Sequence, residues 1–220
     1  MSDDLRVALA AGISSLGLTV GEAAQQQLLD YMALIQKWNK VYNLTALREP
    51  KEILTHHLLD SLSAVGPLMQ QASSLGATFS FLDVGSGGGL PGVVIAICCP
   101  QVSVTCVDTV SKKAAFVQQV AASLKLGNLK GLHARVETLS GPFDVIGSRA
   151  FASLPDFVSW SSDALADKGI WMAMKGKLPQ EEMAALPPVA QVFHVEQLHV
   201  PGLNAERCMI WMKKSSALSA

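Results

Sequence analysis

The glycine-rich segment at residues 83–92 (DVGSGGGLPG) narrows the possible folds of this chain more than any other stretch. It lies between an apolar run at 79–83, predicted to be a buried strand, and another at 91–99, predicted to be a helix. Glycines at such a junction let the backbone turn tightly and let a ligand approach without a Cβ in the way. The helix start adds unpaired N–H groups and partial positive charge. The segment therefore predicts a ligand-binding strand–loop–helix unit of a doubly wound α/β domain.

Strands and helices are expected to alternate after this unit. Further strands are predicted at 102–107, 129–133, 143–147 and 170–174, and further helices at 111–124, 154–165 and 179–186. Ser111 is predicted to cap the first of these helices, and Gly127 to end it. Such alternation implies a parallel sheet with right-handed crossovers.

The last part of the chain follows a different pattern. Residues 192–200 and 207–212 alternate polar and apolar side chains and are joined by a segment that contains Pro201 and Gly202. This pattern predicts an antiparallel hairpin at the edge of the sheet. Residues 77–214 are therefore expected to form a mostly parallel, seven-stranded, doubly wound α/β domain, and 215–220 a frayed tail.

Residues 1–76 are predicted to form a helical extension that packs on this domain. Apolar side chains recur at helical spacing from Leu28 to Trp38. A second helix is expected to begin at Pro50 and to end near Gly66 and Pro67. A chain of 220 residues of which 50% are hydrophobic is long enough for one sizeable core.

The composition also bears on the compartment. The N-terminus is acidic where a signal peptide would be basic. No apolar run approaches the ~18 residues that span a membrane. None of the four cysteines lies in a C-x-x-C arrangement, and Cys98 and Cys99 are expected to be buried thiols. We therefore expect a cytoplasmic protein without a membrane contact.

The net charge of −1 gives no support to a nucleic-acid partner, although a local basic patch remains open. Four basic residues of the extension lie near Trp38 and Tyr42. Such a mixture either binds RNA backbone and stacks on bases, or consists of core aromatic rings beside solvated cations. The core interpretation is favoured for Trp38. The basic residues are Lys37, Lys40, Arg48 and Lys51.

Two classes of ligand fit the glycine loop. Gly87, Gly89 and Gly92 satisfy G-x-G-x-x-G, and Asp108 ends the next strand, which is the pattern of NAD-binding domains. In an earlier frame, however, Asp83 precedes Gly85-x-Gly87-x-Gly89, which resembles motif I of class I methyltransferases. The terminal hairpin and the short remaining chain also favour S-adenosylmethionine over a two-domain dehydrogenase.

The two acids are candidate cofactor residues. A carboxylate at Asp108 can accept hydrogen bonds from both ribose hydroxyls, and the alternative is that it caps the helix near Ser111. Asp83 either orients the loop backbone or approaches the methionine amino group through water.

The chain as a whole resembles the family of ribosomal RNA small-subunit methyltransferase G, also called glucose-inhibited division protein B. The resemblance runs from about Leu28 to Lys213 and depends on the order and spacing of several motifs. These are WNK and NLTA at 38–46, H-x-x-DSL at 57–62, DVGSGxGLPG at 83–92, D-x-x-x-KK-x-x-F at 108–116, RVE at 135–137, SRAFA at 148–152, KG at 175–176 and VP-x-L-x-x-ER at 200–207.

This resemblance implies a Rossmann-like class I methyltransferase that transfers the methyl group of S-adenosylmethionine to N7 of one guanine near the decoding centre of 16S rRNA. It implies the 30S subunit as partner and a monomeric enzyme. A small-molecule methyltransferase, a NAD-dependent oxidoreductase and a silent cofactor-binding module are the alternatives. The cofactor contacts that the motifs imply are Gly85, Leu90, Val136, Glu137 and Arg149, and the glycine-loop argument adds Asp83, Gly87 and Asp108.

Guanine N7 carries a free lone pair, so the reaction needs alignment and not a general base. We expect no metal site; His56, His57 and Asp60 are interpreted as a polar clamp or an RNA contact. Two basic residues at strand ends are the candidate catalytic residues. Arg149 holds a phosphate or the guanine O6, pairs with a cofactor-side acid, or forms a structural ion pair under the loop. Lys175 meets an RNA phosphate or is a solvated lysine.

Overall fold

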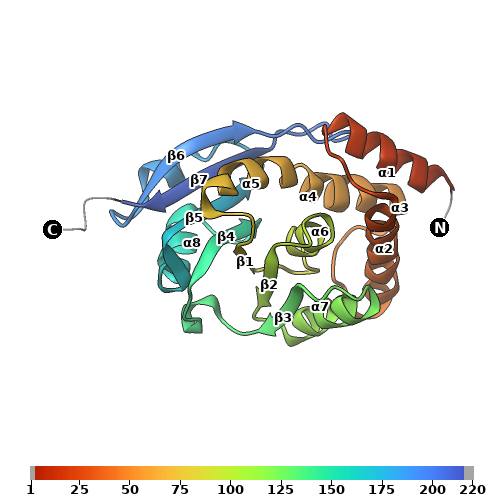
Figure 1. The fold of residues 1–220 in the computed structure, drawn as a ribbon, viewed down its shortest axis with the longest axis horizontal. Coiled ribbons are helices and arrows are strands. Elements are labelled where there is room, and N and C mark those ends of the chain that lie inside the picture. Colours follow the sequence, from red (N-terminus) through yellow and green to blue (C-terminus); the bar gives the residue numbers. More distant parts are fainter. Residues whose placement is uncertain (1–2, 216–220) are drawn as a thin grey trace.

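The computed structural model describes residues 3–215, and within them seven strands form one sheet between layers of helices (Figure 1). The strand order is β3-β2-β1-β4-β5-β7-β6. The predicted mostly parallel, seven-stranded sheet is therefore confirmed. The strands are β1 (Ser80–Val84), β2 (Ser103–Asp108), β3 (Leu129–His133), β4 (Phe143–Arg149), β5 (Leu165–Lys175), β6 (Ala190–Gln197) and β7 (Cys208–Lys214).

The terminal hairpin is also confirmed. Strands β1 to β5 pair in parallel, whereas β7 pairs antiparallel with both β5 and β6, which leaves β6 at the edge. The chain reverses its order next to β1, because β2 lies on one side of β1 and β4 on the other. Ligands of open α/β sheets bind outside the carboxyl ends of the strands at such a point.

Side chains of the central strands alternate between two apolar layers. Phe81 and Trp211 belong to one buried cluster, and their neighbours Leu82 and Ile210 belong to the other. This two-residue period buries both faces, as expected for a sheet covered on each side. The covering helices are α6 (Gly92–Cys98), α7 (Ser111–Ser123), α8 (Leu154–Ser161) and α9 (Gln180–Ala184), with 3₁₀ turns η3 (Val136–Thr138) and η4 (Ser162–Ala164).

The N-terminal residues are helical, as predicted, and pack on the sheet domain. Leu28, Leu29 and Met32 of α2 share one buried cluster with side chains of the sheet. Trp38 packs against Phe116 of α7, with ring centroids 5.3 Å apart, which confirms its assignment to the core. The elements are α1 (Asp3–Ser15), α2 (Glu22–Tyr42), α3 (Pro50–Ile53), the π-helical η1 (Leu54–Leu59), α4 (Asp60–Leu62), α5 (Val65–Gln71) and the 3₁₀ turn η2 (Ala72–Leu75).

Several predicted helix ends are wrong. Helix α5 begins at Val65 and continues through Gly66 and Pro67 to Gln71, because a proline in the first turn of a helix lacks only an N–H that has no intrahelical partner there. The left-handed residue after α7 is Lys125, at φ 55°, and not Gly127.

The cap of α7 also differs from the expectation. The position before α7 is Val110, whose N–H donates to the Asp108 side chain, so Ser111 is not the cap.

The four cysteines pack in the apolar core. Cys99 is a buried free thiol, as predicted, whereas Cys98 is only partly buried; Cys106 and Cys208 are also buried free thiols. No helix among residues 3–215 is long and apolar enough to cross a membrane. Of the predicted tail, residues 216–220 lie outside the described part of the chain.

Candidate functional site

The glycine loop lies at the carboxyl end of β1 and adopts backbone conformations that exclude most side chains. Gly85 and Gly87 have φ of 65° and 58°, in the left-handed region that favours glycine. A Cβ at Gly85 would overlap the ring of Phe151, whereas a Cβ at Gly87 would point into open space. The absence of a Cβ thus lets Phe151 pack against Gly85 and leaves open space beside Gly87; the approach of a ligand to this backbone stays a prediction.

Asp83 lies beneath this loop and is fully buried. Its Oδ2 accepts a hydrogen bond of 2.8 Å from the N–H of Gly92, the first residue of α6. Burial raises the pKa of Asp83 to about 7, although the Gly92 hydrogen bond opposes this shift. Its Oδ1 has no partner among the described residues. Asp83 therefore orients the loop and retains one free acceptor.

Asp108, at the end of β2, holds two backbone segments at once. Its Oδ2 accepts from Gly87 N at 2.9 Å, and its Oδ1 accepts from Val110 N at 2.8 Å. The second bond corresponds in part to the capping alternative for this residue. Each carboxylate oxygen has a further lone pair, so Asp108 can still accept from a ligand.

A cavity of about 450 Å³ opens beside Asp108. Four of the predicted cofactor residues line it: Gly85, Asp108, Val136 and Glu137. The side chain of Glu137 is bonded to Arg135, with 2.7 Å between Oε1 and the guanidinium. The cavity is further lined by Val84, Val107, Thr109, Val110, Lys113, Ala134, Arg135, Ala150, Phe151 and Trp160.

An aromatic wall of this cavity was not predicted. Phe151 and Trp160 meet edge to face with centroids 5.9 Å apart. Phe151 belongs to the SRAFA motif, but nothing in its spacing distinguishes it from a core residue. Trp160 lies on α8 and leaves 39% of its surface exposed, which no sequence pattern indicates.

A second cavity, of about 150 Å³, lies on the other side of Gly85 and shares Gly85 and Ala150 with the first. Three more predicted residues line it: Gly87, Leu90 and Arg149. The extension supplies the opposite wall. The structure therefore brings the predicted cofactor residues together around two adjoining spaces, except for Asp83, which lies beneath them. The extension residues at the second cavity are Ile35, Leu44, Thr45 and His57.

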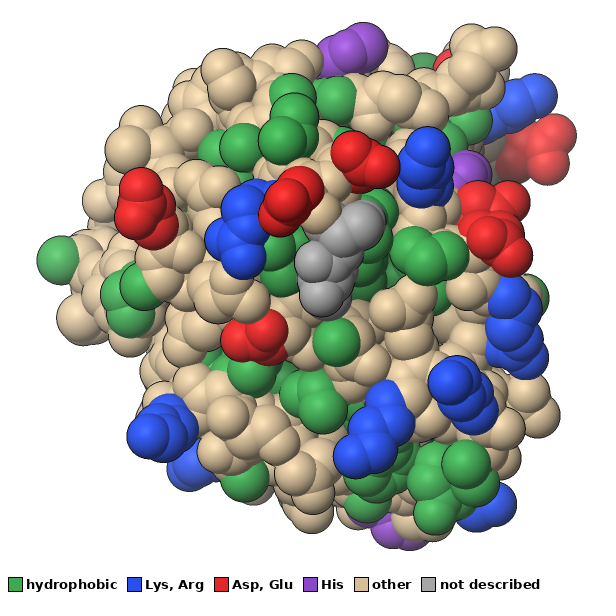
Figure 2. Space-filling model, turned by 90° about the vertical axis from the view of Figure 1, so that its right-hand side faces the viewer, with side chains coloured by type: hydrophobic (Ala, Val, Ile, Leu, Met, Phe, Trp, Pro, Cys, Tyr) green, Lys and Arg blue, Asp and Glu red, His purple; other side chains and the backbone are tan. Residues whose placement is uncertain are grey.

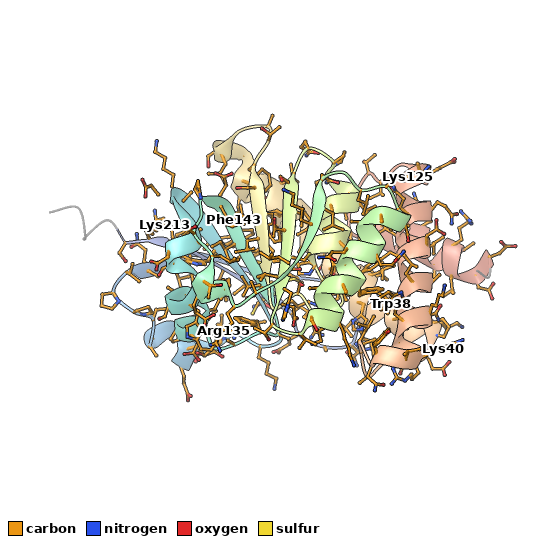
Figure 3. The ribbon with its side chains drawn as sticks, turned by 90° about the horizontal axis from the view of Figure 1, so that it is seen from below. Trp38, Lys40, Lys125, Arg135, Phe143 and Lys213 are labelled. Atoms are coloured by element: carbon orange, nitrogen blue, oxygen red, sulfur yellow. The ribbon has the colours of Figure 1, made fainter. Side chains whose placement is uncertain are left out.

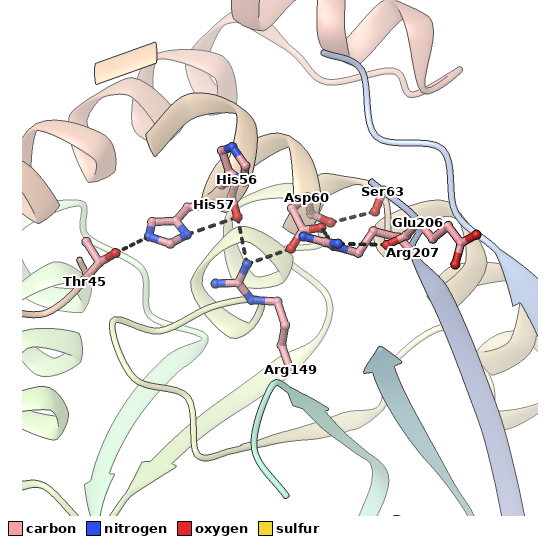
Figure 4. Close-up of polar contacts among 8 residues, drawn as sticks. All are labelled: Thr45, His56, His57, Asp60, Ser63, Arg149, Glu206 and Arg207. Carbon is pink, nitrogen blue, oxygen red and sulfur yellow. Dashed lines mark hydrogen bonds and ion pairs between the residues drawn. The ribbon is translucent and has the colours of Figure 1, made fainter. Parts of the chain in front are cut away.

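Arg149 forms a buried ion pair with the extension (Figure 4). Its Nη1 donates to Asp60 Oδ2 at 2.7 Å and to the carbonyl oxygen of His56 at 2.9 Å. Arg207 donates to the other oxygen of Asp60 at 2.8 Å, and the Asp60 side chain is only 3% exposed. Of the alternatives for Arg149, the structure shows the ion pair, with Asp60 and not with a cofactor-side acid.

His57 and Thr45 form a neutral hydrogen-bonded pair next to Arg149, with 2.7 Å between Nε2 and Oγ1 (Figure 4). Burial, reinforced by the nearby Arg149 cation, lowers the pKa of His57 to about 4. Of the three residues interpreted as a polar clamp or an RNA contact, His57 bonds Thr45, Asp60 bonds Arg149 and Arg207, and His56 accepts from Arg149 through its backbone carbonyl oxygen; an RNA contact stays a prediction. Among residues 3–215, no three His, Cys, Asp or Glu side chains are placed to hold a metal ion.

Lys175 ends β5, as predicted, but lines neither cavity. Its Nζ donates to Glu182 at 2.7 Å and to the carbonyl oxygen of Ala152 at 2.8 Å. The alternative of a solvated lysine is wrong, because its side chain is only 17% exposed and is bonded at the ammonium group.

The residues present fit a nucleoside ligand with a charged tail. The larger cavity offers an acid, Asp108, between the apolar side chains of Val107 and Val136. Gly85, which has no side chain, lines both the larger and the smaller cavity. Beneath the loop, the buried Oδ1 atom of Asp83 has no hydrogen-bond partner among the described residues. A sulfonium nucleoside requires these features: a ribose acceptor, an apolar adenine slot and a loop without side chains.

Comparison with protein families supports this assignment. Residues 24–210 match the model described as rRNA small subunit methyltransferase G. The chain is 60% identical over its whole length to the ribosomal RNA small subunit methyltransferase G of Paracidovorax citrulli, of which it covers 94%. It is 64% identical to the protein of the same name from a Polaromonas species, over 95% of this chain and 93% of that protein.

Solved structures share the fold at low sequence identity. TrmN from Thermus thermophilus matches 74% of this chain and 53% of its own, with a TM-score of 0.57 and 17% identity. Coclaurine N-methyltransferase bound to S-adenosylhomocysteine (SAH) matches 97% of this chain and 89% of its own, with a TM-score of 0.56 and 11% identity. These likenesses show a methyltransferase-type α/β fold.

Proposed function

The chain belongs to the rRNA small subunit methyltransferase G family, and we propose that it transfers the methyl group of S-adenosylmethionine to N7 of a guanine in 16S rRNA, the base at position 527. The observation that carries the proposal is the pair of adjoining cavities that meet at Gly85 and Ala150. One cavity suits a nucleoside, and the other brings an arginine and a hydrogen-bonded histidine next to it.

Each cavity is proposed to bind a different part of the cofactor. Asp108 accepts from the ribose hydroxyls of the cofactor, and Val136 and Glu137 hold its adenine. Gly85, Leu90 and Arg149 would hold its methionine end. The target guanine approaches from the side of Thr45 and His57, because these side chains face the glycine loop across that cavity.

The chemistry assigned to the protein is alignment. The cofactor, when bound, supplies a methyl group on a positively charged sulfur. Guanine N7 has a free lone pair at neutral pH, so no residue has to remove a proton. The guanine becomes cationic; of the two basic side chains at the smaller cavity, His57 is neutral and Arg149 is paired with Asp60. Good positioning of two reactants can supply about 7–11 kcal/mol of a barrier.

Arg149 and Lys175 are proposed to act on the substrate side. The Nη1 group of Arg149 is bonded to Asp60 and His56, while its side chain lines the smaller cavity, so the remaining N–H groups can donate to a ligand. Arg149→Ala should reduce methyl transfer at least tenfold without unfolding the protein, since Asp60 keeps its bond to Arg207. Lys175→Gln, measured in parallel, tests whether the lysine contributes from beyond the cavities. Intact activity in Arg149→Ala would contradict the role of Arg149.

The function is tested on the RNA. We expect mass spectrometry of 16S rRNA from cells without this gene to show loss of one 7-methylguanine, and the purified protein with S-adenosylmethionine to restore it. We propose that the protein acts as a monomer in the cytoplasm and that its substrate is the 30S particle. Naked 16S rRNA and 30S subunits should be offered separately, because this comparison tests which of them is methylated. Methylation of small molecules only, or binding of NADH in place of SAH, would contradict the proposal.

A further inference from the structure

An exposed aromatic ring with a lysine over it lies at the junction of the extension and the sheet domain. Tyr42 ends α2, is 42% exposed, and packs on Trp38 with ring centroids 5.0 Å apart. The Nζ of Lys112, from the first turn of α7, lies 5.5 Å from the centre of the Tyr42 ring. Below it, Trp38 packs on Phe116, which fixes the ring to the core.

This pair lies at the same edge of the molecule as the two cavities. Leu44 and Thr45, which line the smaller cavity, follow Tyr42 closely in the chain, and Lys113, next to Lys112, lines the larger one. Figure 3 shows Trp38 and Arg135, which lines the larger cavity, in the lower half of the view, and Lys125 and Phe143 in the upper half. A strand of RNA that delivers a base to the cavities would therefore pass the Tyr42 ring.

The charges around this pair favour an anionic partner. Lys112 forms no ion pair with any residue of 3–215, and with Lys113 it occupies the first turn of a helix, where the helix dipole disfavours cations. On the side of the molecule that α2 covers, most acidic side chains gather in the upper half of the view and Lys and Arg in the lower half, toward α7 (Figures 1 and 2). The even net charge of the whole chain thus conceals a local excess.

We propose that Tyr42 and Lys112 bind a nucleotide of the rRNA strand that flanks the target guanine. The base packs against the exposed part of the Tyr42 ring, and the Lys112 ammonium, which lies over that ring, pairs with the phosphate, as aromatic rings and lysines do in single-stranded RNA sites. The inference rests on the proposed function and adds to it the place where the substrate strand enters. Tyr42 and Lys112 are binding residues that touch RNA beside the reacting base.

The protein offers its own control. Lys213 lies 5.7 Å from the ring centre of Phe193, which is 39% exposed, so this second pair repeats the chemistry on β6 and β7. Figure 3 shows Lys213 at the opposite end of the molecule from Trp38. Exposed lysine–aromatic pairs also occur on ordinary protein surfaces. Variants of Phe193 and Lys213 therefore measure the effect of losing such a pair away from the proposed RNA contact.

The test uses the full-length protein, S-adenosylmethionine and unmodified 30S subunits. Tyr42→Ala should raise KM for the subunit about 5- to 150-fold, the range of one base–aromatic stack, while kcat at saturating subunit and SAH affinity stay unchanged. Tyr42→Phe should behave as wild type, because it keeps the ring. Lys112→Gln should reduce the slope of log affinity against log salt by about 1 in filter binding to 16S rRNA, and Lys112→Arg should not.

Each result is decisive. Phe193→Ala and Lys213→Gln should leave KM and the salt slope unchanged; if Tyr42→Ala changes KM no more than Phe193→Ala, the inference is overturned. Should Tyr42→Ala lose its native unfolding transition, Tyr42→Leu, which keeps an apolar contact with Trp38 but has no ring, takes its place with the same expectation. Failure of the wild-type protein to methylate both the 30S subunit and naked 16S rRNA would count against the proposed function itself, and intact methylation with unchanged KM only against this RNA contact.

Discussion

Asp108 is the residue on which cofactor affinity should depend most. Asp108→Ala removes a charge-assisted acceptor of the ribose, so we expect SAH affinity to fall by about 2 kcal/mol, roughly 30-fold. Isothermal titration calorimetry measures this loss. Because Asp108 also holds Gly87 and Val110, dideoxyadenosine serves as a second ligand: a ribose role leaves its affinity unchanged, whereas equal losses for both ligands would indicate a loop-holding role only. Asp167→Ala, at an exposed acid far from the cavities, is the matched control.

Asp83 should make stability depend on pH. Its pKa is about 7 in the folded protein, and an unfolded Asp titrates near 4, so between these values the folded state binds more protons. The free energy of unfolding should therefore be highest below pH 4 for this group and fall as the pH rises to 7, by an amount on the order of 3–4 kcal/mol. Asp83→Asn cannot ionise and should lack this fall. Urea unfolding of both proteins at pH 5 and pH 8 checks it; a stability difference that does not change with pH would show that Asp83 titrates normally.

The sequence indicated the positions of residues that local spacing fixes, and missed contacts that are made across the fold. Asp108 and Gly85 are predictable because a strand end and a tight turn fix their position. The Asp60 contacts are not, since its arginine partners lie 89 and 147 residues away in the chain, and only tertiary packing brings them together.

Helix α2 should support the glycine loop through one hydrogen bond. The Tyr31 hydroxyl donates to the carbonyl oxygen of Gly88 at 2.6 Å, and burial raises the pKa of Tyr31 well above its usual value, so the hydroxyl keeps its proton. Tyr31→Phe removes the donor, and we expect about 1 kcal/mol less stability and a fewfold weaker binding of SAH. Tyr42→Phe is the control, because it removes an exposed hydroxyl from the same helix. Equal SAH affinities for the two variants would mean that α2 does not shape the loop.

Element type was more predictable than element ends. Strand β3 has the predicted bounds, whereas β5 begins five residues before the predicted start. Its first half carries Asp167, Lys168 and Gly169, which do not look like a strand; they lie at a register shift between Leu165 and Ile170, and these two residues pair with β4 on either side of them. Long-range pairing therefore overrides local propensity there.

At the scale of the whole molecule, the extension and the sheet should unfold together. The buried side chains of α1 and α2 belong to the same apolar cluster as those of β1, β2 and β7, so neither part has a separate core on that face. Leu29 of α2 is only 1% exposed, and Leu29→Ala should lower the free energy of unfolding by about 2–5 kcal/mol, from lost burial and the cavity that remains.

The decisive measurement is whether Leu29→Ala lowers the stability of the sheet as well as that of the extension. In urea unfolding, far-UV circular dichroism follows the helices, and fluorescence follows tryptophans that include the fully buried Trp171 and Trp211 of β5 and β7. Coincident transitions, both shifted to lower urea in Leu29→Ala, are expected if one cooperative unit includes the extension. Val41→Ala, at a 70% exposed position of the same helix, should shift neither. If Leu29→Ala moved the helical signal and left the tryptophan transition in place, the extension would be a separately stable part, and the wall it gives to the smaller cavity would be able to open while the sheet stays folded.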